Sequence, residues 1–162
     1  MKTLKIALAS ICILLTQMVF GQANEVNQML GAYYEMKDAL IADDGKTAST
    51  KANEVLKWVE VFPENKLSNS QLKTWQENTA KIKLEAEHIS KSNDVEFQRD
   101  HLNELSGSLF RLLKGLKMNE HAVYQQYCPM KKAYWLSAEK EIKNPYYGEK
   151  MLACGSVKET LK

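Results

Sequence analysis

Length, composition and charge set the first limits on this chain. It has 162 residues, 44% of them hydrophobic and 26% charged, with 22 basic and 20 acidic side chains. This length suits one ordinary domain with its own buried core. The near-neutral balance, with both signs interspersed, offers no surface that would track phosphates, so we expect no nucleic-acid partner.

The first residues form a pattern typical of an export signal. Lys2 and Lys5 precede an apolar run over residues 6–15, and small side chains follow at Gly21 and Ala23. A basic start, a short apolar run and a small-residue region characterise secretory signal peptides. The run is shorter than the ~20 residues that a membrane helix needs. We therefore expect residues 1–23 to be removed, with cleavage after Gly21 or after Ala23, which leaves a periplasmic or secreted protein without a membrane span.

Removal of this peptide changes two counts. Without Lys2 and Lys5, the 22 basic residues fall to 20 and equal the 20 acidic ones. Cys12 is lost as well, so two of the three cysteines remain, Cys128 and Cys154. A disulfide between them can persist outside the cytoplasm.

Four segments then repeat apolar residues at spacings of three and four, which predicts helices with one buried face. The first covers residues 26–42, and Asp43-Asp44-Gly45 ends it, with either Asp able to cap the second. A loop is expected from Pro63 to residue 70, before the third helix. Asn93 followed by Glu96 resembles a capping box that opens the fourth. The apolar positions are Met29, Tyr33, Met36 and Leu40; Ala48, Ala52, Val55, Val59 and Phe62; Leu72, Trp75, Ile82, Ala86 and Ile89; and Leu102, Leu105, Leu109, Leu112 and Leu116.

The helical pattern ends after Gly115. Residues 123–127 are compatible with a short extended segment, and Ser137 is a candidate cap for a brief helix that stops before Asn144-Pro145. We predict an all-α fold: an antiparallel four-helix bundle over residues 24–117, with an irregular C-terminal tail over residues 118–162 that contains one short strand and one short helix and packs on the bundle. Residues 24–162 then form a single domain.

Sulfur-containing residues cluster in the tail. Cys128-Pro129-Met130 and Met151-Leu152-Ala153-Cys154 each carry one cysteine and one methionine. Thiolates and thioethers favour Cu(I), while imidazole suits copper, zinc and nickel. We consider a metal site formed by Cys128, Met130, Met151 and Cys154, with His88 or His121 contributing. The alternative from spacing alone is a Cys128–Cys154 disulfide, because the chain has no CxxC or zinc-finger spacing.

Other polar residues fit structural roles. His88 and His101 sit at the edges of helical apolar faces, where a histidine commonly bonds a neighbouring polar group. Carboxylates such as Glu85 and Glu87 fit a solvated helix face. No partnered nucleophile and base is visible, so we do not expect an enzyme.

The tail and several bundle positions resemble a bacterial family known as domain of unknown function 3347. The residues that carry the resemblance are Tyr33-Tyr34, Lys37-Asp38-Ala39-Leu40, Ala42-Asp43-Asp44, His88, Arg99, Leu105-Ser106, Tyr127-Cys128-Pro129-Met130, Trp135-Leu136-Ser137, Asn144-Pro145-Tyr146-Tyr147-Gly148, Met151-Leu152 and Cys154-Gly155. Leu102 stands where the family would have Phe. The family resembles small exported proteins and domains attached to periplasmic adaptors of heavy-metal and copper efflux pumps.

This resemblance implies a setting for the chain. It favours a periplasmic protein that binds or buffers a soft metal, with Cu(I) as its ion, and an efflux-system component or another envelope protein as its partner. The Tyr-x-Cys-Pro-Met sequence also resembles short heavy-metal-binding modules, which continue with His where this chain has Lys131. A disulfide-stapled helical interaction module without metal remains the alternative.

Overall fold

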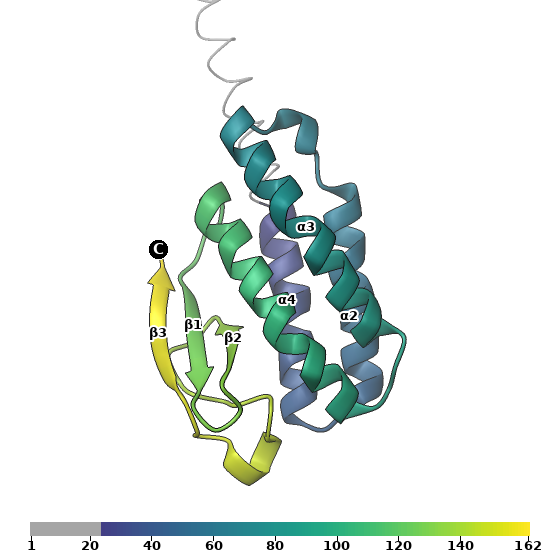
Figure 1. The fold of residues 1–162 in the computed structure, drawn as a ribbon, viewed down its shortest axis with the longest axis vertical. Helices are drawn as coiled ribbons and strands as arrows, with labels where there is room; N and C mark the ends of the chain where they lie inside the picture. The colour runs from purple at the N-terminus through teal and green to yellow at the C-terminus, as the bar shows by residue number, and fades with distance from the viewer. Residues whose placement is uncertain (1–23) are drawn as a thin grey trace, which may run out of the picture.

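The computed structural model describes residues 24–162, in which a small β-sheet lies along one side of a group of helices (Figure 1). The predicted signal peptide lies outside the described residues. The first helix is described over residues 24–41 and is followed by α2 (Gly45–Val61), α3 (Asn69–Ser90) and α4 (Val95–Leu116). A short 3-10 helix, η1 (Glu64–Lys66), connects α2 to α3. Within residues 24–162, none of the helices combines the length and apolar character that crossing a membrane requires.

The helix starts follow from side-chain caps. Asp44 accepts a hydrogen bond from the Thr47 backbone N–H at 3.0 Å, so the second of the two predicted candidates caps α2. Ser68 and Gln71 form a full capping box at the start of α3. The prediction for α4 was one residue off: Asp94, not Asn93, is the cap, and it accepts from the backbone N–H groups of residues 96 and 97.

The predicted apolar faces form the core. Nearly every residue of the four periodic sets is buried, and Leu72, at the start of α3, is half-buried. Burial of such side chains stabilises a fold by about 1.5–3 kcal/mol each. The helical bundle predicted from periodicity is therefore confirmed.

The tail agrees with the prediction at residues 123–127, which are extended as expected, and differs from it elsewhere. It forms a three-stranded antiparallel sheet in the order β2-β1-β3, with β1 (Val123–Cys128) in the middle. Ser137 does not cap a helix, because it is the last residue of strand β2 (Ala133–Ser137) and pairs with Tyr124. The third strand, β3 (Ser156–Leu161), was not anticipated. The one short helical segment is η2, a 3-10 turn over Gly148–Met151.

A buried tyrosine joins the sheet to the bundle. The Tyr33 hydroxyl, on the first helix, accepts from the Leu136 backbone N–H of β2 at 3.0 Å and lies 2.6 Å from the Ser106 hydroxyl on α4. Ser106 in turn donates to the Leu102 carbonyl. Burial raises the pKa of Tyr33 to about 12, so it stays protonated and can donate to Ser106.

We expect Tyr33→Phe to lower the free energy of unfolding by about 1–3 kcal/mol, because the buried Leu136 N–H loses its acceptor. Urea denaturation provides the measurement. Tyr34→Phe is the matched control, since the Tyr34 hydroxyl makes no hydrogen bond to another residue of the described chain. Equal losses in the two variants would show that the hydroxyl network does not hold the sheet in place.

Candidate metal centre

Cys128 ends the central strand and begins a tight turn. The turn covers residues 129–132 and returns the chain into β2, with Lys132 in the left-handed region at φ 56°. The Cys128 side chain is fully buried, and its Sγ accepts the Lys131 backbone N–H at 3.4 Å. A hydrogen bond from a backbone N–H stabilises the charged form of the thiol that it reaches.

Cys154 is held by the segment that follows Asn144. The buried Asn144 side chain donates to the Cys154 carbonyl at 2.7 Å, and its backbone N–H donates to the Leu152 carbonyl at 2.8 Å. The Cys154 N–H donates to the Met151 carbonyl at the end of η2. These bonds close the loop over residues 144–154, so Asn144 positions the second cysteine against the first.

The two sulfur atoms are brought together. The Sγ atoms of Cys128 and Cys154 lie 3.7 Å apart, and both cysteines are free. A disulfide bond measures about 2.05 Å between its sulfurs. Two thiolates that share one ion at about 2.3 Å, at a tetrahedral angle, lie about 3.8 Å apart. The observed separation is that of an S–H···S hydrogen bond, and two thiolates that share a tetrahedral ion would lie at nearly the same distance.

The two thiols differ in acidity. Burial raises the pKa of the Cys128 thiol, but hydrogen bonds from the Lys131 backbone, the Asn144 side chain and the Cys154 thiol outweigh burial and leave this pKa below its ordinary value. Burial and the interaction with Cys128 raise the pKa of Cys154. Cys128 therefore ionises first, with the Cys154 S–H as its hydrogen-bond donor, and the thiolate is the metal-binding form.

The two methionines flank this pair on the exterior. Met130 follows Cys128 in the turn and is 65% exposed, while Met151 precedes Cys154 by three residues and is 36% exposed. Both methionines are therefore exposed at positions within three residues of a cysteine in the chain.

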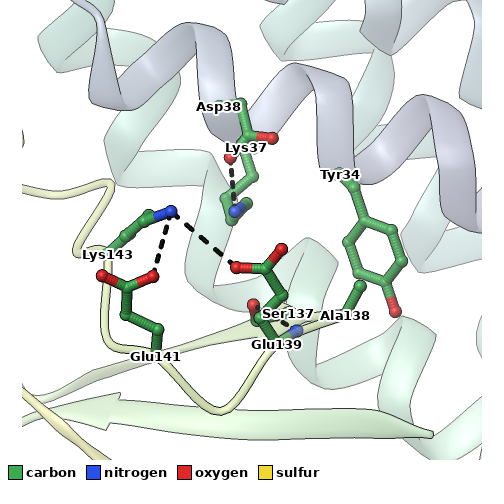
Figure 2. A pocket seen from close by; sticks show the side chains of 8 residues that line it. All are labelled: Tyr34, Lys37, Asp38, Ser137, Ala138, Glu139, Glu141 and Lys143. Carbon is green, nitrogen blue, oxygen red and sulfur yellow. Dashed lines mark hydrogen bonds and ion pairs between the residues drawn. The ribbon is translucent and has the colours of Figure 1, made fainter.

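A polar pocket lies near the other end of the sheet, between the first helix and the loop after β2 (Figure 2). Its charged side chains pair with one another: Lys143 lies 3.2 Å from Glu141 and 3.8 Å from Glu139, and Lys37 pairs with Asp38. Two lysines face three carboxylates here, which leaves a net charge of −1, and each of these charges already has a partner.

The structure does not bring His121 to the sulfurs. His121 precedes β1 and Cys128 ends it, so the two residues are separated by the length of a strand, about 20 Å. His121 instead lines an apolar pocket with Leu30 and Val123.

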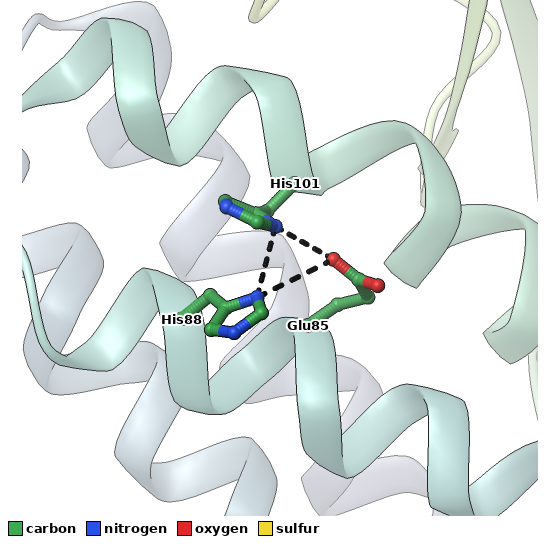
Figure 3. Close-up of side chains that lie close together, drawn as sticks. All are labelled: Glu85, His88 and His101. Carbon is green, nitrogen blue, oxygen red and sulfur yellow. Dashed lines mark hydrogen bonds and ion pairs between the residues drawn. The ribbon is translucent and has the colours of Figure 1, made fainter.

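His88 also lies apart from the cysteines. Its side chain meets His101 from α4 and Glu85 from its own helix, as Figure 3 shows. In residues 24–162, no further His, Asp or Glu joins both cysteine sulfurs to make a compact three-ligand group. Glu85 and His101 are expected from the sequence to have structural roles, although the i, i+3 spacing of Glu85 and His88 on one helix is a signal for a shared site.

A family model described as "Protein of unknown function (DUF3347)" matches residues 29–121. The matched range covers most of the helical bundle and ends before Cys128. No curated protein and no solved structure matches the chain.

Proposed function

The chain belongs to the DUF3347 family, and from this premise we propose that it is an exported protein that binds Cu(I), or a similarly soft ion, between Cys128 and Cys154. The observation that carries the proposal is the 3.7 Å separation of the two free sulfurs. Soft thiolate ligands select Cu(I) over harder ions.

The environment of the pair supports this role. The lowered pKa of Cys128 favours its thiolate form, which an incoming ion binds, while Cys154 is partly exposed and gives access from solvent. Once an ion binds, its charge favours loss of the second thiol proton as well. Affinity should then fall as the pH falls, because protons compete for both sulfurs.

The methionines suit a role in transfer. Met130 and Met151 are exposed and lie within three residues of Cys128 and Cys154 in the chain, where a thioether could receive an ion from solvent or pass it to a partner. We therefore propose buffering of Cu(I), or its delivery to an efflux component, as the biological task. The periplasmic setting and the efflux partner come from the family resemblance and from the signal-like residues 1–23.

Titration with Cu(I) under reducing, oxygen-free conditions, against a chromophoric competitor, tests the proposal. We expect one ion per chain, and a loss of affinity of at least about a hundredfold in the Cys128→Ser, Cys154→Ser double variant, more than loss of an outer-shell contact produces. Met118→Leu is the control, because Met118 is a half-buried methionine that is not among the proposed sulfur ligands. Absence of stoichiometric uptake, or equal uptake by the double variant, would refute copper binding by this pair.

The same proximity favours a disulfide as the alternative. Closing the Cys128–Cys154 loop would stabilise the fold by about 3–4 kcal/mol in the chain-entropy estimate. Alkylation and intact-mass measurement of protein taken directly from the periplasm separates the two. Two alkylated thiols agree with the metal site, and a chain that resists alkylation until reduced would identify the stapled module.

A further inference from the structure

Three ligand-type side chains converge between α3 and α4, away from the cysteine pair. The His101 Nδ1 atom lies 2.7 Å from Glu85 Oε2 and 3.2 Å from His88 Nδ1, and His88 Nδ1 lies 4.0 Å from the same Glu85 oxygen. Figure 3 shows that the three side chains point toward one another from the two helices. Each contributes an atom that can carry a lone pair.

Hydrogen bonds among these three side chains satisfy their polar atoms poorly. The 2.7 Å contact makes His101 Nδ1 the donor to Glu85, which leaves no lone pair on that nitrogen for a second hydrogen bond from His88. The His88 nitrogen therefore faces a donor that is already directed at the carboxylate. A cation at the centre would use a lone pair from all three groups at once.

The spacing fits a single divalent ion. Ligand atoms about 2.0–2.1 Å from a tetrahedral zinc lie about 3.3 Å from one another. The three observed separations, 2.7, 3.2 and 4.0 Å, lie on both sides of that value. Imidazole and carboxylate ligands suit zinc and neighbouring divalent ions rather than Cu(I), whose preferred ligands are sulfurs.

The surroundings keep the ligands in position and leave one side open. The Glu85 side chain is only 8% exposed, and its other oxygen lies 3.4 Å from Lys81. The Phe97 ring packs against His101 with ring centroids 4.6 Å apart. His88 is 42% exposed, so a fourth position is available to water or to a ligand atom from a partner.

We infer that Glu85, His88 and His101 form a second metal site, which binds one divalent ion of the zinc class and joins α3 to α4. This site is independent of the proposed copper pair, since it uses different residues and different ligand chemistry. By binding only the folded chain, the ion would also stabilise the bundle.

Isothermal titration with Zn²⁺ tests this inference in the Cys128→Ser, Cys154→Ser background, where the thiols cannot contribute. We expect one ion per chain, and a loss of affinity of at least about tenfold in His88→Ala, in His101→Ala and in Glu85→Gln. His121→Ala is the matched control and should bind as the background does, because His121 lies outside the cluster.

A second measurement covers the case in which a variant loses stability. Saturating Zn²⁺ should raise the melting temperature of the Cys128→Ser, Cys154→Ser chain, and this rise should disappear in His88→Ala, whose side chain is 42% exposed and should be replaceable without unfolding. Absence of saturable binding in the Cys128→Ser, Cys154→Ser chain, or binding unchanged by all three substitutions, would overturn the site. Cu(I) uptake by His88→Ala should stay intact, so failure of this site is distinguishable from failure of the copper pair.

Discussion

Replacing Arg99 by methionine is expected to lower the free energy of unfolding by about 2–4 kcal/mol, because two buried carbonyls lose their donors. The Arg99 side chain is 5% exposed on α4. Its Nε donates to the Pro145 carbonyl at 2.7 Å, and its Nη2 donates to the Leu40 carbonyl at 2.7 Å. One guanidinium thus holds together the end of the first helix, α4 and the loop that leads to Cys154.

This substitution should also weaken copper binding. Pro145 begins the segment that leads to Cys154. Loss of the Arg99 hydrogen bond to its carbonyl would loosen this segment and make the distance between the Cys128 and Cys154 sulfurs more variable. Urea denaturation gives the stability loss and Cu(I) competition gives the affinity. Arg111→Met is the matched control on the same helix, because the Arg111 side chain is 58% exposed. Similar stability losses in the two variants would show that burial of the Arg99 contacts contributes little.

The second large effect is expected at Gly155, directly after Cys154. An added Cβ would lie 2.7 Å from the Trp135 ring and 3.1 Å from the Tyr127 carbonyl, and φ is +155°. Gly155→Ala must therefore push the chain away from the sheet, at a cost of about 1–3 kcal/mol. Because Cys154 would move with it, we expect Cu(I) affinity to fall about tenfold or more, at a loss of about 1.4 kcal/mol per tenfold.

Gly31→Ala supplies the comparison for this experiment. Gly31 lies in the first helix with nothing within 4 Å of an added Cβ, so alanine there should stabilise the protein by about 0.5–1 kcal/mol. Both variants are measured by thermal unfolding and by Cu(I) competition. A Gly155→Ala protein with unchanged affinity would mean that the position of Cys154 does not control binding.

The helices were predictable because their signal is local. Residues such as Met29 and Tyr33 repeat with the helical period, and each set of such residues is buried in the core. The tail was not predictable in the same way, because its sheet depends on pairing between distant segments. Ser is a common helix-capping residue, yet the pairing of Ser137 in β2 with Tyr124 in β1 decides its conformation.

The candidate sites also divide into residues that the sequence identifies and contacts that only the fold reveals. Cys128 and Cys154 were identifiable as a pair because they are the two cysteines that lie outside the N-terminal apolar run. The contact of His88 with His101 depends on how α3 packs on α4, which the spacing of each helix does not reveal. Asn144 was noticed within a motif, but its role in holding Cys154 required the fold.

X-ray absorption at the copper edge, on protein loaded with one equivalent of Cu(I), tests the central claim most directly. The shared position between Cys128 and Cys154 predicts at least two sulfur neighbours around copper, which disappear in the Cys128→Ser, Cys154→Ser variant. A first shell that contains only nitrogen and oxygen, or a spectrum that is the same in the double variant, would contradict the account.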